Sequence, residues 1–121
     1  MSAVRLLVDG MNVIGSRPSG WWRDREGAMR ELVADLDAYA DETGAEVAVV
    51  FDGRPFELAG ERVEVAFASR AGRDAADDDI AARAAPGLTV VTSDAALAER
   101  ARAAGAEVMG AGSFRRRLDG R

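Results

Sequence analysis

Three short apolar segments of the chain each lead into an aspartate, and this pattern limits the possible folds more than any other feature. The segments are Val4–Val8 before Asp9, Glu46–Phe51 before Asp52, and Leu88–Thr92 before Ser93 and Asp94. Apolar residues run through them almost without interruption, as in strands that are buried on both faces of a parallel sheet. We therefore predict three buried parallel strands, each followed by a carboxylate.

Helical patterns separate these segments. From about Asp24 to Glu42, apolar residues recur at intervals of three and four, acids occupy the other face, and Gly44 follows as a stop signal. The remaining expected elements are helices over Asp74–Ala85 and Ala95–Ala104, an edge strand or extended segment over Val63–Phe67, a strand over Glu107–Met109, and a small last helix that Ser113 could cap. Strands joined by helices predict an α/β fold with a mainly parallel sheet covered on both faces.

The composition restricts the chemistry that the chain could perform. Its 121 residues suit a single domain over residues 1–121, and they include no Cys, no His and no Lys. These absences exclude thiolate nucleophiles, imidazole bases, Ser-His-Asp triads, thiolate zinc sites and P-loop lysines. Carboxylates, hydroxyls, amides and guanidinium groups remain, a set that suits Mg²⁺ or Mn²⁺. Without a signal-like start or an apolar run of about 18 residues, we expect a cytoplasmic protein with no membrane attachment.

The aspartates that follow the strands should meet in space. The carboxyl ends of parallel strands share one edge of a sheet, and a helix that follows a strand begins at that edge. This places Asp9, Asp52 and Asp94 near a run of acids at the start of the helix over Asp74–Ala85, which includes Asp77, Asp78 and Asp79.

Each of these acids also has an ordinary structural explanation, as an Asp-Gly turn, a solvated first helical turn or, for Asp94, a helix N-cap. Together they would repel one another unless a divalent cation neutralised them. Such carboxylates could hold one or two Mg²⁺ or Mn²⁺ ions, which would activate a water molecule to attack a phosphodiester.

Four segments of the sequence resemble the ordered motifs of the NYN domain, a branch of the PIN-like nucleases, and in particular its bacterial YacP-like members. They are VDGMNVIG at Val8–Gly15, VVFDG at Val49–Gly53, AADDDI at Ala75–Ile80, and VVTSD at Val90–Asp94. The match runs in register from about Val4 to Leu118. The resemblance implies a PIN-like three-layer α/β/α fold and divalent-metal-dependent cleavage of RNA, which makes the chain an expected (endo)ribonuclease.

The resemblance also implies roles for individual residues. Asp9, Asp77 and Asp94 would face the metal, and the run of three aspartates makes Asp78 an additional candidate ligand. Asp52 occupies a position where the family has an aspartate, so we expect catalysis to involve Asp9, Asp52, Asp77 and Asp94. Asn12 and Ser93 would orient the ligand or a water molecule. The chain departs from the family at Met11, where Tyr is common, and in ending soon after Arg115–Arg117, whereas many relatives continue.

The charge distribution indicates where RNA could bind. A net charge of −5 and a pI near 4.8 are unusual for a general nucleic-acid binder. Trp21, Trp22 and Arg23 could combine base stacking with a phosphate contact, although one tryptophan could instead anchor a loop to the core. Arg54 is a further candidate contact, and Arg115–Arg117 could equally be a solvated tail. Binding to free RNA should be weak at physiological salt, so a partner such as the ribosome could deliver the substrate.

A competing interpretation is a non-catalytic RNA- or ribosome-binding module with the same fold. Two other classes fit poorly, because a Mg²⁺-dependent phosphatase needs D-x-D after the first strand, where this chain has D-G-M, and a dinucleotide-binding domain needs G-x-G-x-x-G. The preference between RNA and DNA, endonucleolytic or exonucleolytic cleavage, the number of metal ions and the oligomeric state stay open.

Overall fold

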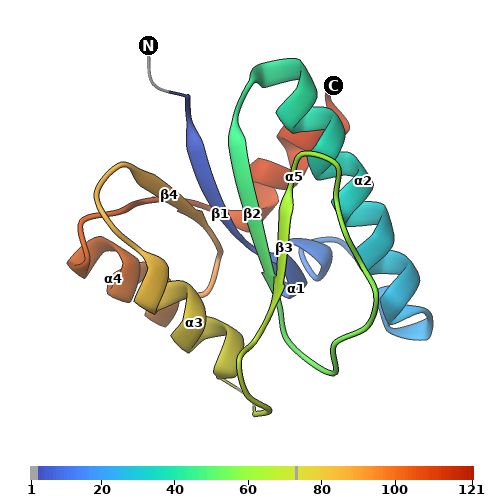
Figure 1. Cartoon of the computed structure of the whole chain (residues 1–121), viewed down its shortest axis with the longest axis horizontal. Helices are drawn as coiled ribbons and strands as arrows, with labels where there is room; N and C mark the ends of the chain where they lie inside the picture. Colours follow the sequence, from blue (N-terminus) through green and yellow to red (C-terminus); the bar gives the residue numbers. More distant parts are fainter. Residues whose placement is uncertain (1–2, 73) are drawn as a thin grey trace.

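In the computed structural model, which describes residues 3–72 and 74–121, the strands form one all-parallel sheet (Figure 1). The order across the sheet is β3-β2-β1-β4-β5. The strands are β1 (Arg5–Asp9), β2 (Glu46–Phe51), β3 (Glu64–Phe67), β4 (Leu88–Val91) and β5 (Glu107–Met109). β1 is central, with Asp9 aligned to Val50 of β2 and Val8 aligned to Val91 of β4.

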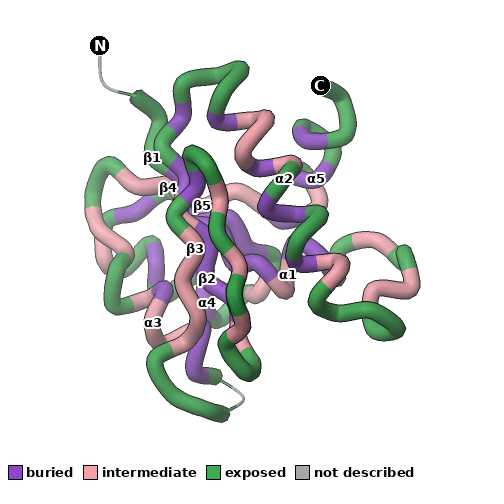
Figure 2. Tube along the Cα trace, turned by 45° about the vertical axis from the view of Figure 1, so that its right-hand side comes forward, coloured by how far each residue is buried: buried purple, intermediate pink, exposed green. Residues whose placement is uncertain are grey.

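Helices cover both faces of this sheet. They are α1 (Gly10–Ile14), the 3₁₀ turn η1 (Trp21–Arg23), α2 (Arg25–Thr43), α3 (Ala75–Arg83), α4 (Ala95–Ala103) and α5 (Ala111–Asp119). Leu6 and Val8 pack with α1, α2 and α5, whereas Leu7 packs with α3 and α4. Figure 2 shows the buried residues gathered along the central strands between these layers. The arrangement confirms the predicted α/β/α sandwich, and its two cores explain why the strand segments are apolar throughout.

Most predicted elements are present within one or two residues of their expected bounds. The segment Val63–Phe67 is the parallel edge strand β3. The N-cap Asp24, which accepts a hydrogen bond from the Gly27 amide, starts α2, and Gly44 ends it in the left-handed conformation with φ +74°.

Two local features differ from the prediction, the short helix α1 and the cap of α5. A helix of five residues is too short for a periodic pattern, so Gly10–Ile14 was not expected to be helical. Ser113 does not cap the last helix, because it lies inside α5. The first amide of that helix, at Ala111, instead donates to the Ser93 hydroxyl (2.8 Å), which comes from the β4–α4 loop.

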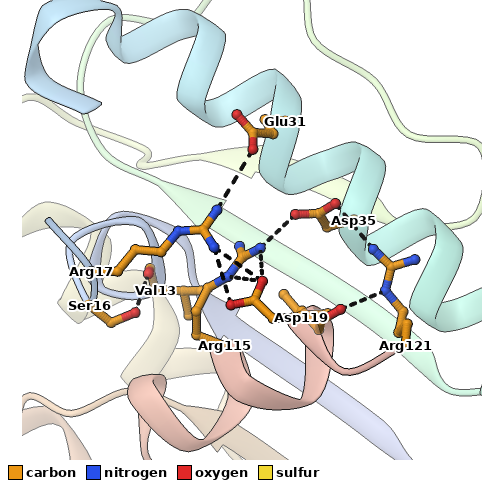
Figure 3. A network of polar contacts seen from close by, with 9 residues as sticks. Val13, Ser16, Arg17, Glu31, Asp35, Arg115, Asp119 and Arg121 are labelled. Carbon is orange, nitrogen blue, oxygen red and sulfur yellow. Dashed lines mark hydrogen bonds and ion pairs between the residues drawn. The ribbon is translucent and has the colours of Figure 1, made fainter. Parts of the chain in front are cut away.

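An ion-pair network joins α5 to α2 and to the loop after α1 (Figure 3). The buried Arg115 guanidinium donates to Asp35 (2.9 Å) on α2 and to Asp119 (2.7 Å) on its own helix. Asp119 also accepts from Arg17, and Asp35 also accepts from Arg121. We call these five residues the α2–α5 network. Arg115 is therefore part of the fold and not of a solvated tail, while the neighbouring Arg116 and Arg117 are exposed.

Across the described residues, no helix combines the length and apolar character needed to cross a membrane.

Candidate active site at the carboxyl edge of the sheet

Asp9 is the last residue of the central strand β1 and its side chain enters the protein interior, since only 6% of the residue is exposed. Its Oδ2 atom accepts a hydrogen bond from the Thr92 hydroxyl at 2.9 Å. Residue 10, where α1 begins, is glycine, and a Cβ atom there would lie 2.4 Å from the Phe51 ring. Gly10 is thus required by close packing of α1 against β2.

The environment of Asp9 raises its pKa from 3.8 to about 6. Burial is the main cause, because it disfavours the charged form. The hydrogen bond from Thr92 lowers the pKa, while the carboxylates of Asp77 and Asp94 raise it. Asp9 is therefore held near two other acids in an environment that makes its negative charge unfavourable.

Asp94 both begins α4 and belongs to this group of acids. Its Oδ1 atom caps the helix by accepting from the Leu97 amide at 2.9 Å, as predicted. Its own amide donates to the Thr92 hydroxyl oxygen at 3.1 Å. Because Asp94 raises the pKa of both Asp9 and Asp77, the capping role does not remove it from the acidic site.

Asp77 reaches the site from the first turn of α3. Its pKa is raised, first by partial burial and then by the carboxylates of Asp94 and Asp74, whereas Arg100 lowers it. We call Asp9, Asp77 and Asp94 the acidic cluster. Among the described residues, no arginine lies within 4.0 Å of these three carboxylates, so their charges are not balanced by a direct ion pair.

The cluster suits a divalent cation in charge and donor type. Three carboxylates, one of them buried, repel one another, and hard oxygen donors are those that Mg²⁺ and Mn²⁺ prefer. In the described parts of the chain, no three acids are arranged closely enough to hold a metal ion as they stand. The residues present therefore fit a cation in charge and donor type, but their carboxylates are spaced more widely in this structure than the ligands of a bound ion.

The structure does not bring Asp52 into the cluster. Its carboxylate forms an ion pair with Arg25 at the start of α2, and the same guanidinium donates to the Asp52 carbonyl at 3.2 Å. Asp52 is also not among the groups that shift the pKa of Asp9 or Asp77. The next residue, Gly53, has φ +92°, a conformation that favours glycine and lets the chain leave β2 beside Arg25.

The three consecutive aspartates of α3 have three different sets of neighbours. Asp77 belongs to the acidic cluster, whereas Asp78 forms ion pairs with Arg70 and, at 2.9 Å, with Arg100. These arginines lower the pKa of Asp78, mainly through hydrogen bonds, with Arg100 contributing most. Asp79 accepts hydrogen bonds from the Ser69 amide and hydroxyl. Asp78, a predicted metal ligand, is thus paired with two arginines, although its charge still helps to raise the pKa of Asp77.

Asn12 and Ser93, expected to orient ligand or water, hold the edge of the site together. The Asn12 side-chain oxygen accepts from the Ser93 amide at 2.7 Å, and the Ser93 hydroxyl accepts from Ala111. Sequence reasoning missed Thr92, which is 1% exposed and bonds to both Asp9 and the Asp94 amide. Its only signal was a hydroxyl residue placed directly after a buried strand.

The predicted RNA-contact residues lie at two places on the surface. Trp21 packs against the core and meets the neighbouring Trp22 edge to face, whereas Trp22 is 61% exposed with the Arg23 guanidinium 6.0 Å from its ring. Trp21 is therefore the loop anchor, and Trp22 is the tryptophan that remains available for stacking. Arg54 lies elsewhere, on the exposed loop after β2.

The solved structures that match this chain include two crystal structures of one protein. One is the crystal structure of the W164L mutant of Rae1 (YacP) from Bacillus subtilis, with a TM-score of 0.79 and 29% identity over 96% of this chain and 75% of that chain. A second crystal structure of Rae1 (YacP) from Bacillus subtilis matches with a TM-score of 0.71 and 28% identity over 99% of this chain and 75% of that chain.

Comparison by sequence gives two further findings. A segment is 62% identical over 43 residues to the UPF0178 protein bll3966 of Bradyrhizobium diazoefficiens, a match that covers 36% of this chain and only about a quarter (26%) of that protein. The model of the YacP-like NYN domain matches residues 6–120. The chain therefore belongs to the YacP-like NYN domain family, whose nuclease-like PIN fold supports, in general terms, an RNA-related nuclease function.

Proposed function

We propose that this protein is a divalent-metal-dependent ribonuclease that hydrolyses RNA phosphodiester bonds at the acidic cluster. The observation that carries the proposal is that Asp77 and Asp94, from two other elements, lie near enough to buried Asp9 to help raise its pKa to about 6. A buried carboxylate whose pKa is strongly raised, at the carboxyl edge of a parallel sheet, is typical of a functional site. Family membership supports the same class of reaction.

Asp9, Asp77 and Asp94 would hold Mg²⁺ or Mn²⁺. When bound, such a cation lowers the pKa of a water molecule and offsets the negative charge of the phosphate. This chemistry needs neither the imidazole nor the lysine that the chain lacks.

The chain's own groups keep the carboxylates in place. Thr92 donates to Asp9 Oδ2, and the Leu97 amide in the first turn of α4 donates to Asp94 Oδ1, which leaves Oδ2 of Asp94 without a hydrogen bond from any described residue. In this proposal the two remaining predicted acids position arginines. Asp52 pairs with Arg25, and Asp78 pairs with Arg70 and Arg100.

The first test needs no knowledge of the natural substrate. A cation at about 100 times its Kd stabilises the folded state by about 2.7 kcal/mol, which raises the melting temperature by several degrees. We expect Mn²⁺ to produce this shift in the wild type but not in Asp9→Asn or Asp94→Asn. Asp41→Asn is the matched control, because Asp41 is an exposed aspartate paired with Arg62 away from the site, and it should respond as the wild type does.

The second test measures cleavage directly. Purified protein should cut a single-stranded RNA in Mn²⁺ and stop cutting it when EDTA is added, and the two active-site variants should be inactive. Equal cleavage in EDTA, or an equal Mn²⁺ shift in Asp9→Asn and the wild type, would refute the proposal.

A further inference from the structure

A hollow of about 720 Å³ opens at the carboxyl edge of the sheet, between the loop after β2 and the loop after β3. Residues 52–55 and 68–72 line it, including Arg54 and Arg70. Both loops lie at the lower end of the sheet in Figure 1, the end from which α1 also starts. We call this feature the basic hollow. Its volume is within the range of ordinary ligand sites, about 300–1,000 Å³.

Two neighbouring residues of α3 connect the hollow to the acidic cluster. Asp77 contributes to the cluster, and the next residue, Asp78, forms the ion pair that holds Arg70 at the wall of the hollow. β2, which leads into one wall, is paired directly with β1, which ends at Asp9. A strand of nucleic acid with one phosphate at the cluster would therefore have the hollow next to it.

The lining combines positive charge with apolar surface. Arg54 is exposed and, among the described residues, forms no ion pair within 4.0 Å, whereas Arg70 is paired with Asp78. The one carboxylate in the lining, Asp52, is paired with Arg25. Pro55, Ala68 and Ala71 supply apolar contact area. Guanidinium groups beside a small apolar surface match the two parts of a nucleotide, because the phosphate is anionic and the faces of the base are apolar.

Contacts behind the hollow hold its walls in place. Phe56 packs on Phe67 of β3 with ring centroids 5.6 Å apart, and the Arg30 guanidinium lies 5.0 Å from the centroid of the Phe56 ring. At the far end of the same loop, the Asp37 carboxylate accepts hydrogen bonds from the amides of residues 61–63. A site formed before the ligand arrives spends less binding free energy on ordering its loops.

We propose that the basic hollow binds one nucleotide of single-stranded RNA, adjacent to the phosphate at the acidic cluster, with Arg54 and Arg70 contacting its phosphates and the apolar lining contacting its base. The inference rests on the proposed function and adds the place where the neighbouring nucleotide lies and the side chains that contact it. An unpaired base can turn into the hollow, whereas a base within a duplex is stacked and paired and cannot.

The experiment measures binding of a fluorescein-labelled oligoribonucleotide of about eight nucleotides by anisotropy, in EDTA and at low salt, so that the RNA is not cut. Arg54→Ala and Arg70→Ala should each weaken binding about tenfold, the usual effect of losing one charge-assisted hydrogen bond. Each should also reduce the slope of log K against log salt by about 0.7, the value for one phosphate contact in a single strand.

The matched control is Arg102→Ala, which removes an equal charge from an exposed arginine on α4, beside the β5 edge. It should change the affinity less than about twofold. Arg70→Lys, which keeps the charge, should recover part of the loss. The same RNA annealed to its complement should bind more weakly than the single strand. Equal losses in Arg54→Ala and Arg102→Ala, or equal binding of duplex and single strand, would overturn the inference.

Mn²⁺-dependent melting separates this inference from the proposed function. Arg54→Ala and Arg70→Ala should keep the Mn²⁺ shift and a wild-type melting temperature without metal, which also shows that they fold. If both variants lose RNA binding while the wild type shows no Mn²⁺ shift and no cleavage, the proposed nucleotide site is supported and the ribonuclease proposal is refuted. If the wild type cleaves RNA and the arginine variants bind it normally, the proposed nucleotide site is refuted and the ribonuclease proposal is supported.

Discussion

The acidic cluster and the α2–α5 network use the same types of charged side chain in opposite ways. In the network, buried Arg115 lies between Asp35 and Asp119, and the hydrogen bond from Arg115 is the main reason that the pKa of Asp119 is lowered. In the cluster, burial and neighbouring carboxylates raise the pKa of Asp9 to about 6. Compensated charges of the first kind hold elements together, whereas uncompensated charges of the second kind cost stability and indicate a binding or catalytic role.

The largest effect should come from removing the uncompensated charge. At pH 7.5 without metal, we expect Asp9→Asn to be about 2–3 kcal/mol more stable than the wild type, because a pKa difference of about two units is worth about 3 kcal/mol and the amide carries no charge. Urea unfolding measures the difference. A less stable variant at this pH would contradict the assignment of Asp9 as a strained charge.

The same variant tests the pH dependence. The folded-state pKa of Asp9 is raised above its unfolded value, so the folded state binds the extra proton and stability falls as the pH rises from about 4 through about 6. Asp119 acts in the opposite sense, because its lowered pKa makes its contribution present above the unfolded pKa and lost as the pH falls. In metal-free urea titrations, the decline above pH 4 should shrink in Asp9→Asn, and the two proteins should become similar in stability near pH 4.

Breaking the compensated region should have the opposite sign. Arg115→Met keeps the apolar part of the side chain and removes the charge between Asp35 and Asp119, so we expect a loss of about 2 kcal/mol in the free energy of unfolding. Arg121 and Arg17 still pair with those acids, which limits the loss. Arg117→Met, an exposed position on the same helix, should stay within about 0.5 kcal/mol. Equal losses at both positions would show that α5 depends on total charge and not on the network.

Removing the hydroxyl beneath the cluster should have a smaller effect. Thr92→Val takes away the donor to Asp9 and the acceptor of the Asp94 amide, at a cost of about 1 kcal/mol, and it should raise the pKa of Asp9 further. Carbon-13 NMR titration of the Asp9 carboxyl would measure the pKa. Thr92→Ser keeps the hydroxyl and should give the wild-type pKa of Asp9. An unchanged pKa in Thr92→Val would show that the Thr92 hydroxyl does not stabilise the Asp9 carboxylate.

The smallest effect belongs to an exposed pair. Arg62 and Asp41 lie 3.0 Å apart with more than half of each side chain exposed, and breaking them by Asp41→Asn should cost less than about 0.5 kcal/mol. Denaturant melts at low and high salt test this expectation. A cost comparable to that of Arg115→Met would mean that burial does not explain the difference between the two regions.

The acids of the site show how far sequence reasoning reaches. Asp9 and Asp94 were predictable, because apolar runs mark buried strands and the residues at their ends share an edge. The short helix α1 was not, since five residues carry no periodic signal. The separate roles of Asp77, Asp78 and Asp79 could not be predicted from the sequence either, because neighbouring helical residues point about 100° apart and contact different partners. The partners Arg70 and Arg100 lie 8 and 22 residues from Asp78.

The sequence by itself determined the alternation of strands and helices, a mainly parallel sheet and the residue types available for chemistry, since these follow from local periodicity and composition. The tertiary structure decided the strand order and which carboxylate is neutralised: Asp52 by Arg25, Asp78 by Arg70 and Arg100, and Asp9 by no described arginine. The physical reason is that an electrostatic interaction depends on the distance between charges and on their exposure to water. Both are set by packing between segments that are far apart in the chain.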